Sequence, residues 1–362
     1  MKLIDEYRDP ELARRLVGAM RVRADQAGRG VTIMEVCGSH TYAIGRHGIR
    51  GLLPEGIRLV SGPGCPVCVT SVHDIDVALY VAGLKGVIFV TFGDMLRVPG
   101  TGGSSLQKVR AAGADVRIVA SASECIPIAQ ANPGKEVVFM GIGFETTTPT
   151  IASMVRTCRA KGIANVSVVS VHKVIPPAIR ALLDDPDLAV DAFLCPGHVS
   201  TILGARAYDE IVQRGRAAVI AGFEPVDILE GIYLILGQIV KGEFSVEIQY
   251  RRGVSPQGNP RARALIDEVF EPVDAEWRGL GTIPGSGLSF REEYRGFDAL
   301  KRFEVPLIQS REEKACRCGD ILKGRIDPPG CPLFRTVCTP DNPVGPCMVT
   351  HEGTCSTYYI CC

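Results

Sequence analysis

Cysteines with the spacing of metal ligands are concentrated at the end of this sequence. The last 47 residues hold eight of the 14 cysteines, in a segment rich in Pro and Gly. Four of them are separated by fourteen, six and sixteen residues: Cys316, Cys331, Cys338 and Cys355. Cysteine thiolates are the usual ligands of a [4Fe-4S] cluster, whereas tetrahedral zinc sites more often use paired C-x₂-C motifs. The spacing therefore favours an iron–sulfur cluster, with zinc as the alternative.

The same spacing leaves other thiols unassigned. Cys318 could replace Cys316 as a ligand, and Cys347 could be a ligand, a redox partner or a buried small residue. The C-terminal Cys361 and Cys362 are expected to form a frayed tail, with a reactive surface pair as the alternative.

Two further thiol motifs lie far upstream, each directly after a β-branched apolar run. GPGCPVC holds Cys65 and Cys68 in the C-x₂-C spacing of dithiol–disulfide sites. We favour a redox-active pair or an iron site here over a buried pair or half of a zinc site. EVCGSHT places Cys37 three residues before His40, near enough on a turn for both to face one ligand. A thiolate beside an imidazole can bind a metal or act as nucleophile and base.

Other polar candidates are weaker when taken alone. Glu145 in GFETTTP follows an apolar run, and its carboxylate could position a proton or a cation, although capping of the next helix is a simpler role. His198 in PGHVS and the neighbours His172 and Lys173 are candidates of the same kind, but single histidines are more often structural. Three cysteines have no partner by spacing and are predicted to be structural: Cys125, Cys158 and Cys195.

The elements that must position these residues follow an α/β pattern. Short apolar runs alternate with helical patterns that often end in Gly, as parallel strands covered by helices on both faces do. The expected strands are 31–36, 57–61, 86–92, 116–121, 136–142, 166–171, 191–195 and 217–223. Most of the polar candidates come directly after one of these runs. Because open α/β sheets bind ligands outside the carboxyl ends of their strands, we expect one composite cleft.

A weak internal repeat suggests two similar α/β domains. GVIFVTFGDMLRVPG and EVVFMGIGFETTTP both read as a strand, a turn with Gly and an acidic residue. We place the division near residue 133, which gives domains of 55–132 and 133–225. Beyond about residue 245 the alternation gives way to loops, apart from one helical stretch.

Composition and charge exclude several classes of function. Forty Lys and Arg balance forty Asp and Glu, which gives no electrostatic reason to expect nucleic acid or an anionic membrane as a partner. The N-terminal segment lacks the pattern of a signal peptide, and no apolar run approaches the roughly 20 residues of a membrane span. We therefore expect a cytoplasmic protein, in which a disulfide scaffold is disfavoured. A phosphate-binding loop of the G-x₄-G-K-[ST] type is absent from the sequence.

Taken together, the motifs resemble one family. CGSHT, GPGCPVC, TFGDMLRVPG, GFETTTP, PGHVS and GFEPVDIL, with the terminal CPLF, CTP, NPVGPCMV and EGTC, resemble the HypD family of hydrogenase maturation factors from about residue 31 to residue 359. The resemblance implies a scaffold that works with a HypC-type chaperone to assemble the Fe(CN)₂CO group of [NiFe]-hydrogenases. A HypE-type protein would deliver the cyanide from a C-terminal thiocyanate.

The resemblance also implies roles for particular residues. Cys37 would be the iron ligand of this chain, beside the thiols of Cys65 and Cys68. A [4Fe-4S] cluster on Cys316, Cys331, Cys338 and Cys355 would pass electrons to that site through thiols. The implied fold is two similar α/β domains plus a Cys-rich cluster domain built from both chain ends, 1–54 and 226–362. The sequence departs from the family in its tail, where Ile-Cys-Cys replaces aromatic and basic residues.

Our hypothesis is that Cys37, Cys65 and Cys68 hold or reduce an iron, while His40 and Glu145 support it or handle protons. The first alternative is a stand-alone iron–sulfur thiol–disulfide oxidoreductase that reduces a partner protein. The second is a structural zinc domain attached to a nucleotide-binding α/β protein.

Overall fold

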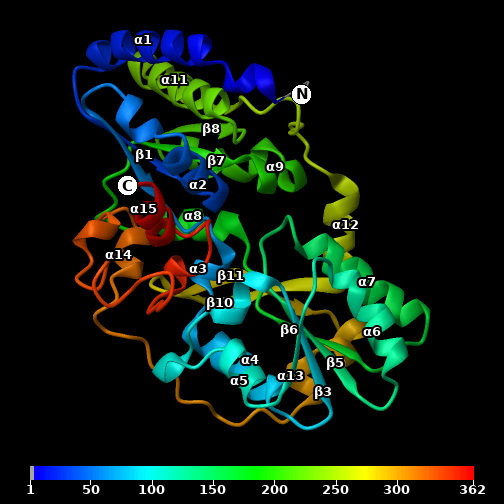
Figure 1. Ribbon diagram of the computed structural model, residues 1–362. Helices are drawn as coiled ribbons and strands as arrows, with labels where there is room; N and C mark the ends of the chain where they lie inside the picture. Colours follow the sequence, from blue (N-terminus) through cyan, green and yellow to red (C-terminus); the bar gives the residue numbers. More distant parts are fainter. Residues whose placement is uncertain (1–3) are drawn as a thin grey trace.

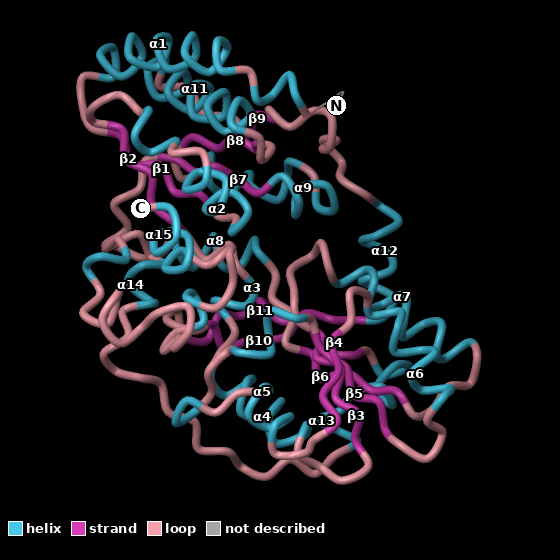
Figure 2. The backbone as a smooth tube through the Cα atoms, viewed as in Figure 1, coloured by secondary structure: helices cyan, strands magenta, loops and turns pink. Residues whose placement is uncertain are grey.

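The expected parallel strands are present and form two separate sheets (Figure 2). The computed structural model describes residues 4–362. In this part of the chain, one sheet has the strand order β2-β1-β7-β8-β9: β1 (Val31–Glu35), β2 (Ile57–Ser61), β7 (Ala192–Pro196), β8 (Ala217–Ala221) and β9 (Val246–Ile248). The other has the order β4-β3-β5-β6: β3 (Val87–Thr91), β4 (Asp115–Ile118), β5 (Glu136–Gly141) and β6 (Val166–Ser170). All pairs within both sheets are parallel, which confirms the α/β class.

Helices cover both faces of the two sheets, as parallel strands that are apolar on both sides require. The helices of the described part are α1 (Pro10–Ala27), α2 (Gly38–Arg46), α3 (Pro66–Val69), α4 (Val72–Ala82), α5 (Leu106–Ala111), α6 (Cys125–Ala131), α7 (Thr148–Ala160), α8 (Ile175–Leu183), α9 (Gly197–Leu203), α10 (Asp209–Gln213), α11 (Pro225–Lys241), α12 (Pro260–Val269), α13 (Ala299–Arg302), α14 (Cys318–Leu322) and α15 (Thr354–Cys361). Helix α1 lies outside α11, so α11 separates it from the five-stranded sheet (Figure 1). In the part of the chain that the structure describes, no helix is long and apolar enough to cross a membrane.

The limits of α11 follow from its local sequence. Pro225 stands at the first helical position, where its missing N–H costs nothing. Glu224 and Asp227 form a reciprocal capping box, and Gly242 ends the helix in a left-handed conformation. The buried face of α11 includes Ile228, which packs against the five-stranded sheet.

The sheets divide the chain at other points than the predicted domain ranges. Strands β3 and β4 from 55–132 pair in one sheet with β5 and β6 from 133–225. The similar segments that suggested two domains are in fact the neighbouring strands β3 and β5 of this sheet, each with its following turn. The five-stranded sheet instead combines β1 and β2 with strands that come more than 100 residues later. In the sequence, the four-stranded sheet comes between β2 and β7. Local patterns do not encode the long-range pairing that brings β1 and β7 together.

An antiparallel hairpin occurs where the sequence suggested loops. Strands β10 (Phe270–Trp277) and β11 (Gly281–Phe290) pair over most of their length. The exposed acidic side of β10 and the glycines of β11 hide the usual alternation of apolar residues. The Trp277 ring stacks on Phe144 with 6.0 Å between centroids, so the hairpin supports the turn that holds Glu145.

The Cys-rich end of the chain has little regular structure beyond α14, α15 and short 3₁₀ turns. It packs beside α2 and α3, which places the end of the chain against its first strand–helix unit (Figure 1). The expectation of a frayed tail fails for Cys361, which is the last residue of α15. Its sulfur would lie 3.6 Å from a Cβ at Gly45 on α2. Packing against α2 keeps this last turn ordered.

Candidate functional site

The Cys37 motif follows a strand at which the order of the first sheet reverses, and the Cys65–Cys68 motif follows the neighbouring edge strand β2. The chain passes from β1 to β2 in one direction, and later from β7 to β8 in the other, so the switch lies between β1 and β7. Cys37 follows β1 and His198 follows β7. In the second sheet the switch lies between β3 and β5, and Glu145 follows β5. Such reversals are where open α/β sheets bind their ligands.

The Cys37 loop and the C-x₂-C loop are in backbone contact. The N–H of Gly38 donates a hydrogen bond of 2.8 Å to the carbonyl oxygen of Gly64. A Cβ on Gly64 would lie 2.2 Å from the backbone N of Cys37, so only glycine fits there. Cys65 and Cys68 are joined by a disulfide, with 5.2 Å between their Cα atoms. The structure therefore places the three predicted thiols in adjoining loops at one sheet edge.

Cys37 is a buried thiol that is held in its neutral form. Its side chain is 7 % exposed. Burial, and after it the charge of the Glu352 carboxylate, raise the pKa of Cys37 to about 12. A bound cation would reverse this preference, because it stabilises the thiolate directly. The free site therefore contains little reactive thiolate at neutral pH.

A buried carboxyl that sequence reasoning missed lies beneath Cys37. Glu35, the last residue of β1, accepts hydrogen bonds from the Cys37 N–H at 3.2 Å and from the Thr41 hydroxyl. Burial raises the pKa of Glu35 to about 7. Glu35 thereby ties the Cys37 turn to the first turn of α2. The sequence feature that could have identified Glu35 is a carboxylate at the end of an otherwise largely apolar strand.

His40 is fixed in one tautomer. Its Nε2 lies 2.9 Å from the Gly222 carbonyl oxygen and 3.2 Å from that of Ala221, so this nitrogen carries the proton and donates. Nδ1 is then an acceptor, and it is buried without a partner among the described residues. Burial lowers the pKa of His40 to about 4, so the ring is neutral. The ring also packs on Phe223, on which His198 stacks at 3.9 Å between centroids.

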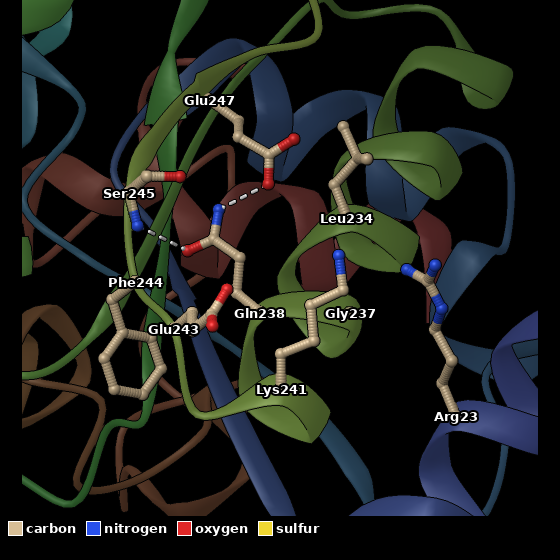
Figure 3. A pocket seen from close by; sticks show the side chains of 9 residues that line it. All are labelled: Arg23, Leu234, Gly237, Gln238, Lys241, Glu243, Phe244, Ser245 and Glu247. Atoms are coloured by element: carbon tan, nitrogen blue, oxygen red, sulfur yellow. Dashed lines mark hydrogen bonds between the residues drawn. The ribbon is translucent and has the colours of Figure 1, made fainter.

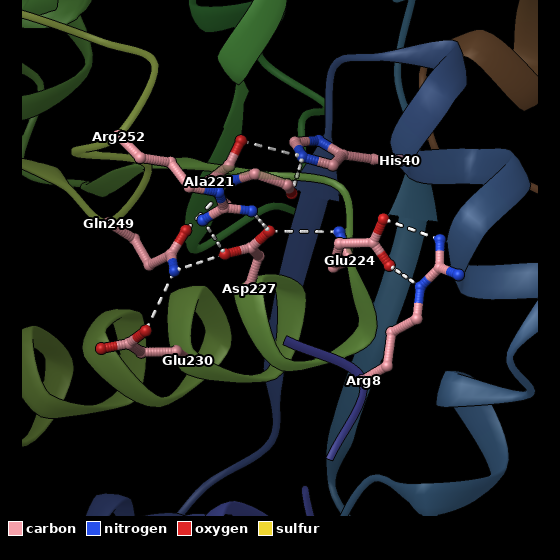
Figure 4. Close-up of polar contacts among 9 residues, drawn as sticks. Arg8, His40, Ala221, Glu224, Asp227, Glu230, Gln249 and Arg252 are labelled. Carbon is pink, nitrogen blue, oxygen red and sulfur yellow. Dashed lines mark hydrogen bonds and ion pairs between the residues drawn. The ribbon is translucent and has the colours of Figure 1, made fainter. Parts of the chain in front are cut away.

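A polar network holds the loop that His40 contacts (Figure 4). The Gly222 N–H donates to the Gln249 side-chain oxygen at 3.0 Å, and the Gln249 amide donates to Asp227 at 2.9 Å. Arg252 forms an ion pair with the same Asp227, which is fully buried. These contacts fix the carbonyl groups that select the His40 tautomer.

Glu145 is buried at the other switch point with half of its hydrogen-bonding capacity unused. Its Oε1 accepts from the Ile175 N–H at 2.9 Å, while Oε2 has no partner among the described residues. Burial raises the pKa of Glu145 to about 7. The buried Tyr208 lies within electrostatic range of both Glu145 and Cys37, because both raise its pKa, after burial and Cys195. No hydrogen bond joins Glu145 to Cys37 among the described residues.

The four predicted cluster ligands line one enclosed apolar pocket. Cys316, Cys331, Cys338 and Cys355 share it with Cys318 and Cys347, and with apolar side chains that include Ile321, Leu333, Phe334 and Met348. The Val344 N–H donates to the Cys338 sulfur at 3.4 Å. A Cβ on Gly345 would lie 2.9 Å from the Cys316 sulfur, so glycine leaves this sulfur its space. Among residues 4–362, no three His, Cys, Asp or Glu side chains converge on a single ion position.

The two thiols that spacing left open form a pair. The sulfurs of Cys318 and Cys347 lie 3.0 Å apart and are buried. A hydrogen bond from the Cys347 thiol lowers the pKa of Cys318, so a proton lost from the pair leaves the charge on Cys318. No sequence signal pairs two cysteines that are 29 positions apart when the same segment holds six others.

The Cys318–Cys347 pair lines the pocket, and the segment that holds Cys347 also contacts the helix of the C-x₂-C motif. Cys347 belongs to η9 (Pro346–Met348), which packs against α3 of the C-x₂-C motif. Both sulfur pairs belong to one buried cluster, against which Cys316 and Cys355 pack. Contacts within the chain thus connect the Cys-rich pocket, through η9, α3 and the Gly38–Gly64 hydrogen bond, with the Cys37 loop.

Glu352 joins the Cys-rich segment to the Cys37 loop directly. Its Oε1 accepts from the Ser39 hydroxyl at 2.6 Å, and its Cβ would lie 2.5 Å from a Cβ on Gly38. An open pocket beside this contact is lined by residues of α2, by His198 and by His351. Glu352 belongs to the sequence motif EGTC. Its contact with Ser39 could not be predicted from the sequence, because the two residues are 313 positions apart.

The remaining candidates stay apart from this arrangement. His172 hydrogen-bonds Ser170 at 2.9 Å, and burial lowers its pKa to about 3. Cys125 and Cys158 are buried in the core of the four-stranded sheet, and Cys195 is buried on β7. A further surface pocket, between α1 and β9, contains Gln238 hydrogen-bonded to Glu247 at 2.7 Å and no cysteine (Figure 3). None of the predicted site residues lines it.

Comparison with known proteins matches nearly the whole chain. The sequence model of the HypD family, described as "Hydrogenase formation hypA family", matches residues 11–361. The chain is 44% identical to the hydrogenase maturation factor HypD of Cupriavidus necator, over 99% of this chain and 97% of that protein. It is 45% identical to the HypD of Azotobacter vinelandii, over 99% and 96% of the two chains. It is 44% identical to the HypD of Escherichia coli, over 99% and 98%. The chain therefore belongs to the HypD family of hydrogenase maturation factors.

Proposed function

We propose that this chain is the redox-active scaffold on which the Fe(CN)₂CO group of [NiFe]-hydrogenases is assembled, together with a HypC-type chaperone and a HypE-type cyanide donor. The observation that carries the proposal is the backbone contact between the Cys37 loop and the Cys65–Cys68 loop. It gathers three thiols at a sheet edge where ligands bind. The iron group is the cargo, and Cys37 is its ligand on this chain.

The residues of the Cys-rich pocket fit a [4Fe-4S] cluster. Thiolates on its walls can each bind a separate iron of a cluster, whereas one zinc ion needs ligands that converge on a point. The apolar walls and the N–H donor at Cys338 suit sulfur ligands, whose potential is tuned by such contacts. Cys316, Cys331, Cys338 and Cys355 would hold the cluster, which supplies electrons one at a time when bound.

The two sulfur pairs can exchange electrons without any other group. In thiol–disulfide exchange, a thiolate of the Cys318–Cys347 pair attacks the Cys65–Cys68 disulfide, and the second thiol of the pair resolves the mixed disulfide. Cys318 and Cys347 are then oxidised to a disulfide, while Cys65 and Cys68 gain two electrons and two protons. This leaves two thiols beside Cys37, where they can bind the incoming iron.

Neighbouring groups hold the site and its protons. Glu35 fixes the Cys37 turn through the Cys37 N–H, and the neutral His40 ring fixes the start of α2. Glu145 is a buried carboxyl with one free oxygen, so it can take up or release a proton at Oε2 as ligands arrive. These roles assign His40 and Glu145 to positioning and proton handling.

Hydrogenase maturation in a host that lacks its own copy tests the iron-ligand role. The Cys37→Ala variant should yield no active [NiFe]-hydrogenase, while Cys195→Ala, a change to another buried cysteine, should support maturation. Infrared bands of iron-bound CO and CN⁻ should be found on the purified complex of wild type with the HypC-type chaperone. Full maturation by Cys37→Ala would end the proposal for this residue.

Iron and sulfide analysis on anaerobically purified protein tests the cofactor. Wild type should contain about four iron and four sulfide per chain and be brown, and Cys338→Ala should lose both. Zinc without sulfide in wild type would instead assign the pocket to a structural metal.

The Cys65–Cys68 disulfide also favours a second candidate function, a stand-alone thiol–disulfide oxidoreductase. That function predicts catalytic turnover with a disulfide protein substrate and no need for a chaperone. A disulfide-reduction assay combined with a pull-down of the HypC-type partner separates the two, since a scaffold binds the partner and does not turn over.

A further inference from the structure

A groove along one side of α1 plays no part in the proposed function. It lies between α1 and the 3₁₀ turn η2 (Ile49–Leu52). Its lining comprises small or apolar residues, including Ala13, Val17 and Gly51, and the arginines Arg14 and Arg21. No acidic residue lines it. Helix α1 packs on α11 through the adjoining face, to which Ala13 and Val17 also contribute, while the groove itself opens to the surface.

Gly18 in the middle of α1 has no role in the fold. Glycine weakens a helix interior, because it loses the most backbone freedom on folding. A Cβ at Gly18 would meet no atom within 4 Å, and the same holds for Gly51 across the groove. Packing therefore does not require glycine at either position. Both leave the groove floor open, so that another backbone can approach closely.

The polar rim of the groove is entirely basic and unpaired. Arg14 and Arg21 are exposed, and neither has an ion-pair or hydrogen-bond partner within residues 4–362. They are seven residues apart on α1, which is two helical turns or roughly 10 Å along one side of the helix. Leu52 on the opposite rim is 46% exposed. The groove thus combines an exposed apolar anchor with two cations at a fixed separation.

We propose that this groove binds a helix of a partner protein that places small or apolar residues over Gly18 and Gly51 and two carboxylates, seven residues apart, opposite Arg14 and Arg21. The spacing follows from the charges, because carboxylates on a helix running alongside α1 match both arginines only when they too are two turns apart. The shallow floor suits a helix with small residues on its contact face.

The groove lies next to the segment that carries Cys37, so binding of a helix there could affect that segment. Turn η2 follows α2 after two residues, and α2 begins directly after Cys37. A helix held against Leu52 is therefore attached to the unit that carries Cys37. The proposal itself does not depend on iron chemistry, and its test uses binding alone.

Labelled peptides of about 20 residues, stapled as helices, test the groove by fluorescence anisotropy with the full chain. One peptide carries two Glu seven residues apart on an Ala/Leu face. A second has Lys at these two positions, and a third has the Glu residues five apart. The first should bind at least tenfold more tightly than the others and weaken as salt is added. Equal binding of the three would overturn the proposal.

Charge-reversal variants show whether a loss of peptide binding comes from the lost charges or from unfolding of the protein. The double variant Arg14→Glu and Arg21→Glu should reverse the preference and bind the Lys peptide at least tenfold better than the Glu peptide. Gly18→Leu should fill the groove and abolish binding of the Glu peptide while the circular dichroism spectrum stays unchanged. Retained binding by Gly18→Leu would overturn the proposal, as would a concentration-dependent dimer in sedimentation that Gly18→Leu abolishes, because a second copy would then occupy the groove.

Discussion

The N–H of Gly38 and the carbonyl oxygen of Gly64 are joined by a hydrogen bond of 2.8 Å, which links the residue after Cys37 to the residue before Cys65. Parallel pairing of β1 with β2, in the register Glu35 to Ser61, brings the two loops that follow these strands to the same edge of the sheet. The separation of the two thiol motifs is therefore set by backbone contacts and not by the flexible side chains. Such preorganisation suits a site that must hold thiols around one ion.

Gly64→Ala is expected to disrupt this contact. The new Cβ would lie 2.2 Å from Cys37 N, so one of the two loop backbones must shift, which disturbs the Gly38–Gly64 hydrogen bond. The free energy of unfolding should fall by about 1–3 kcal/mol, as for other overpacked sites, and hydrogenase maturation should be lost. Urea denaturation and a hydrogenase activity assay measure the two effects.

Gly134→Ala is the matched control for this change. A Cβ at Gly134 meets no atom within 4 Å, so stability and maturation should stay at the wild-type level. Normal maturation by Gly64→Ala would show that the close approach of the two loops is dispensable.

Glu352→Gln should make the Cys37 thiol more reactive. The Glu352 charge is the second cause, after burial, of the raised pKa of Cys37, so its removal should lower that pKa from about 12. Burial remains, and the pKa should therefore stay above the usual value for cysteine. The rate of Cys37 alkylation against pH, followed by mass spectrometry, should rise at lower pH in the variant than in wild type. Ser39→Ala removes the hydrogen bond and keeps the charge, so its profile should follow wild type.

Stability should depend on pH through Glu145. Its pKa is raised by burial from 4.5 to about 7, so the folded state favours the neutral acid. Below pH 4.5 the carboxyl is protonated in both states and its contribution is fully present. As the pH rises towards 7 the unfolded chain ionises first, and the folded protein loses about 3 kcal/mol from this group.

Glu145→Gln should remove this loss, because Gln keeps the oxygen that accepts from the Ile175 N–H and cannot ionise. Urea denaturation at pH 5 and pH 8 should show a smaller fall in stability for the variant than for wild type. Glu304→Gln, at an exposed position, should leave the fall unchanged. An identical fall in wild type and Glu145→Gln would mean that the buried carboxyl is compensated by its surroundings.

Eight of the nine parallel strands in the described part of the chain were predictable because most are short apolar runs such as Val87–Thr91, buried on both faces, whereas the half-buried, three-residue β9 was missed. The assembly of the strands was not predictable, since β1 pairs with β7 across more than 150 positions and no local pattern encodes that pairing. For the same reason β3 and β5, which look like repeats, were assigned to two domains although they are neighbours.

The candidate site was also only partly predictable from the sequence, because long-range contacts form part of it. The types and spacing of Cys37, Cys65 and Cys68 indicated thiol or metal chemistry from the sequence. Glu352 was missed because it reaches Ser39 from 313 positions away. The Cys318–Cys347 pair was left open because spacing gives no reason to prefer this combination among the eight terminal cysteines.

Cys318→Ser should separate electron transfer from cluster binding. Cys318 pairs with Cys347 at 3.0 Å and is not among the four predicted ligands. The variant should therefore keep about four iron and four sulfide, in contrast to Cys338→Ala. Because a serine hydroxyl cannot take part in thiol–disulfide exchange, the Cys65–Cys68 disulfide should persist when the protein is treated anaerobically with dithionite.

Alkylation with a mass tag before and after that treatment counts the free thiols. Wild type should gain the two thiols of Cys65 and Cys68, and Cys318→Ser should gain neither. Cys158→Ser, at a buried cysteine in the core of the four-stranded sheet, controls for the loss of a thiol as such. If Cys318→Ser loses iron instead, Cys318 is a cluster ligand and the electron path must leave the pocket elsewhere. If it keeps iron and its disulfide still opens, the path bypasses this pair, and Cys347 is then only a buried neighbour of α3.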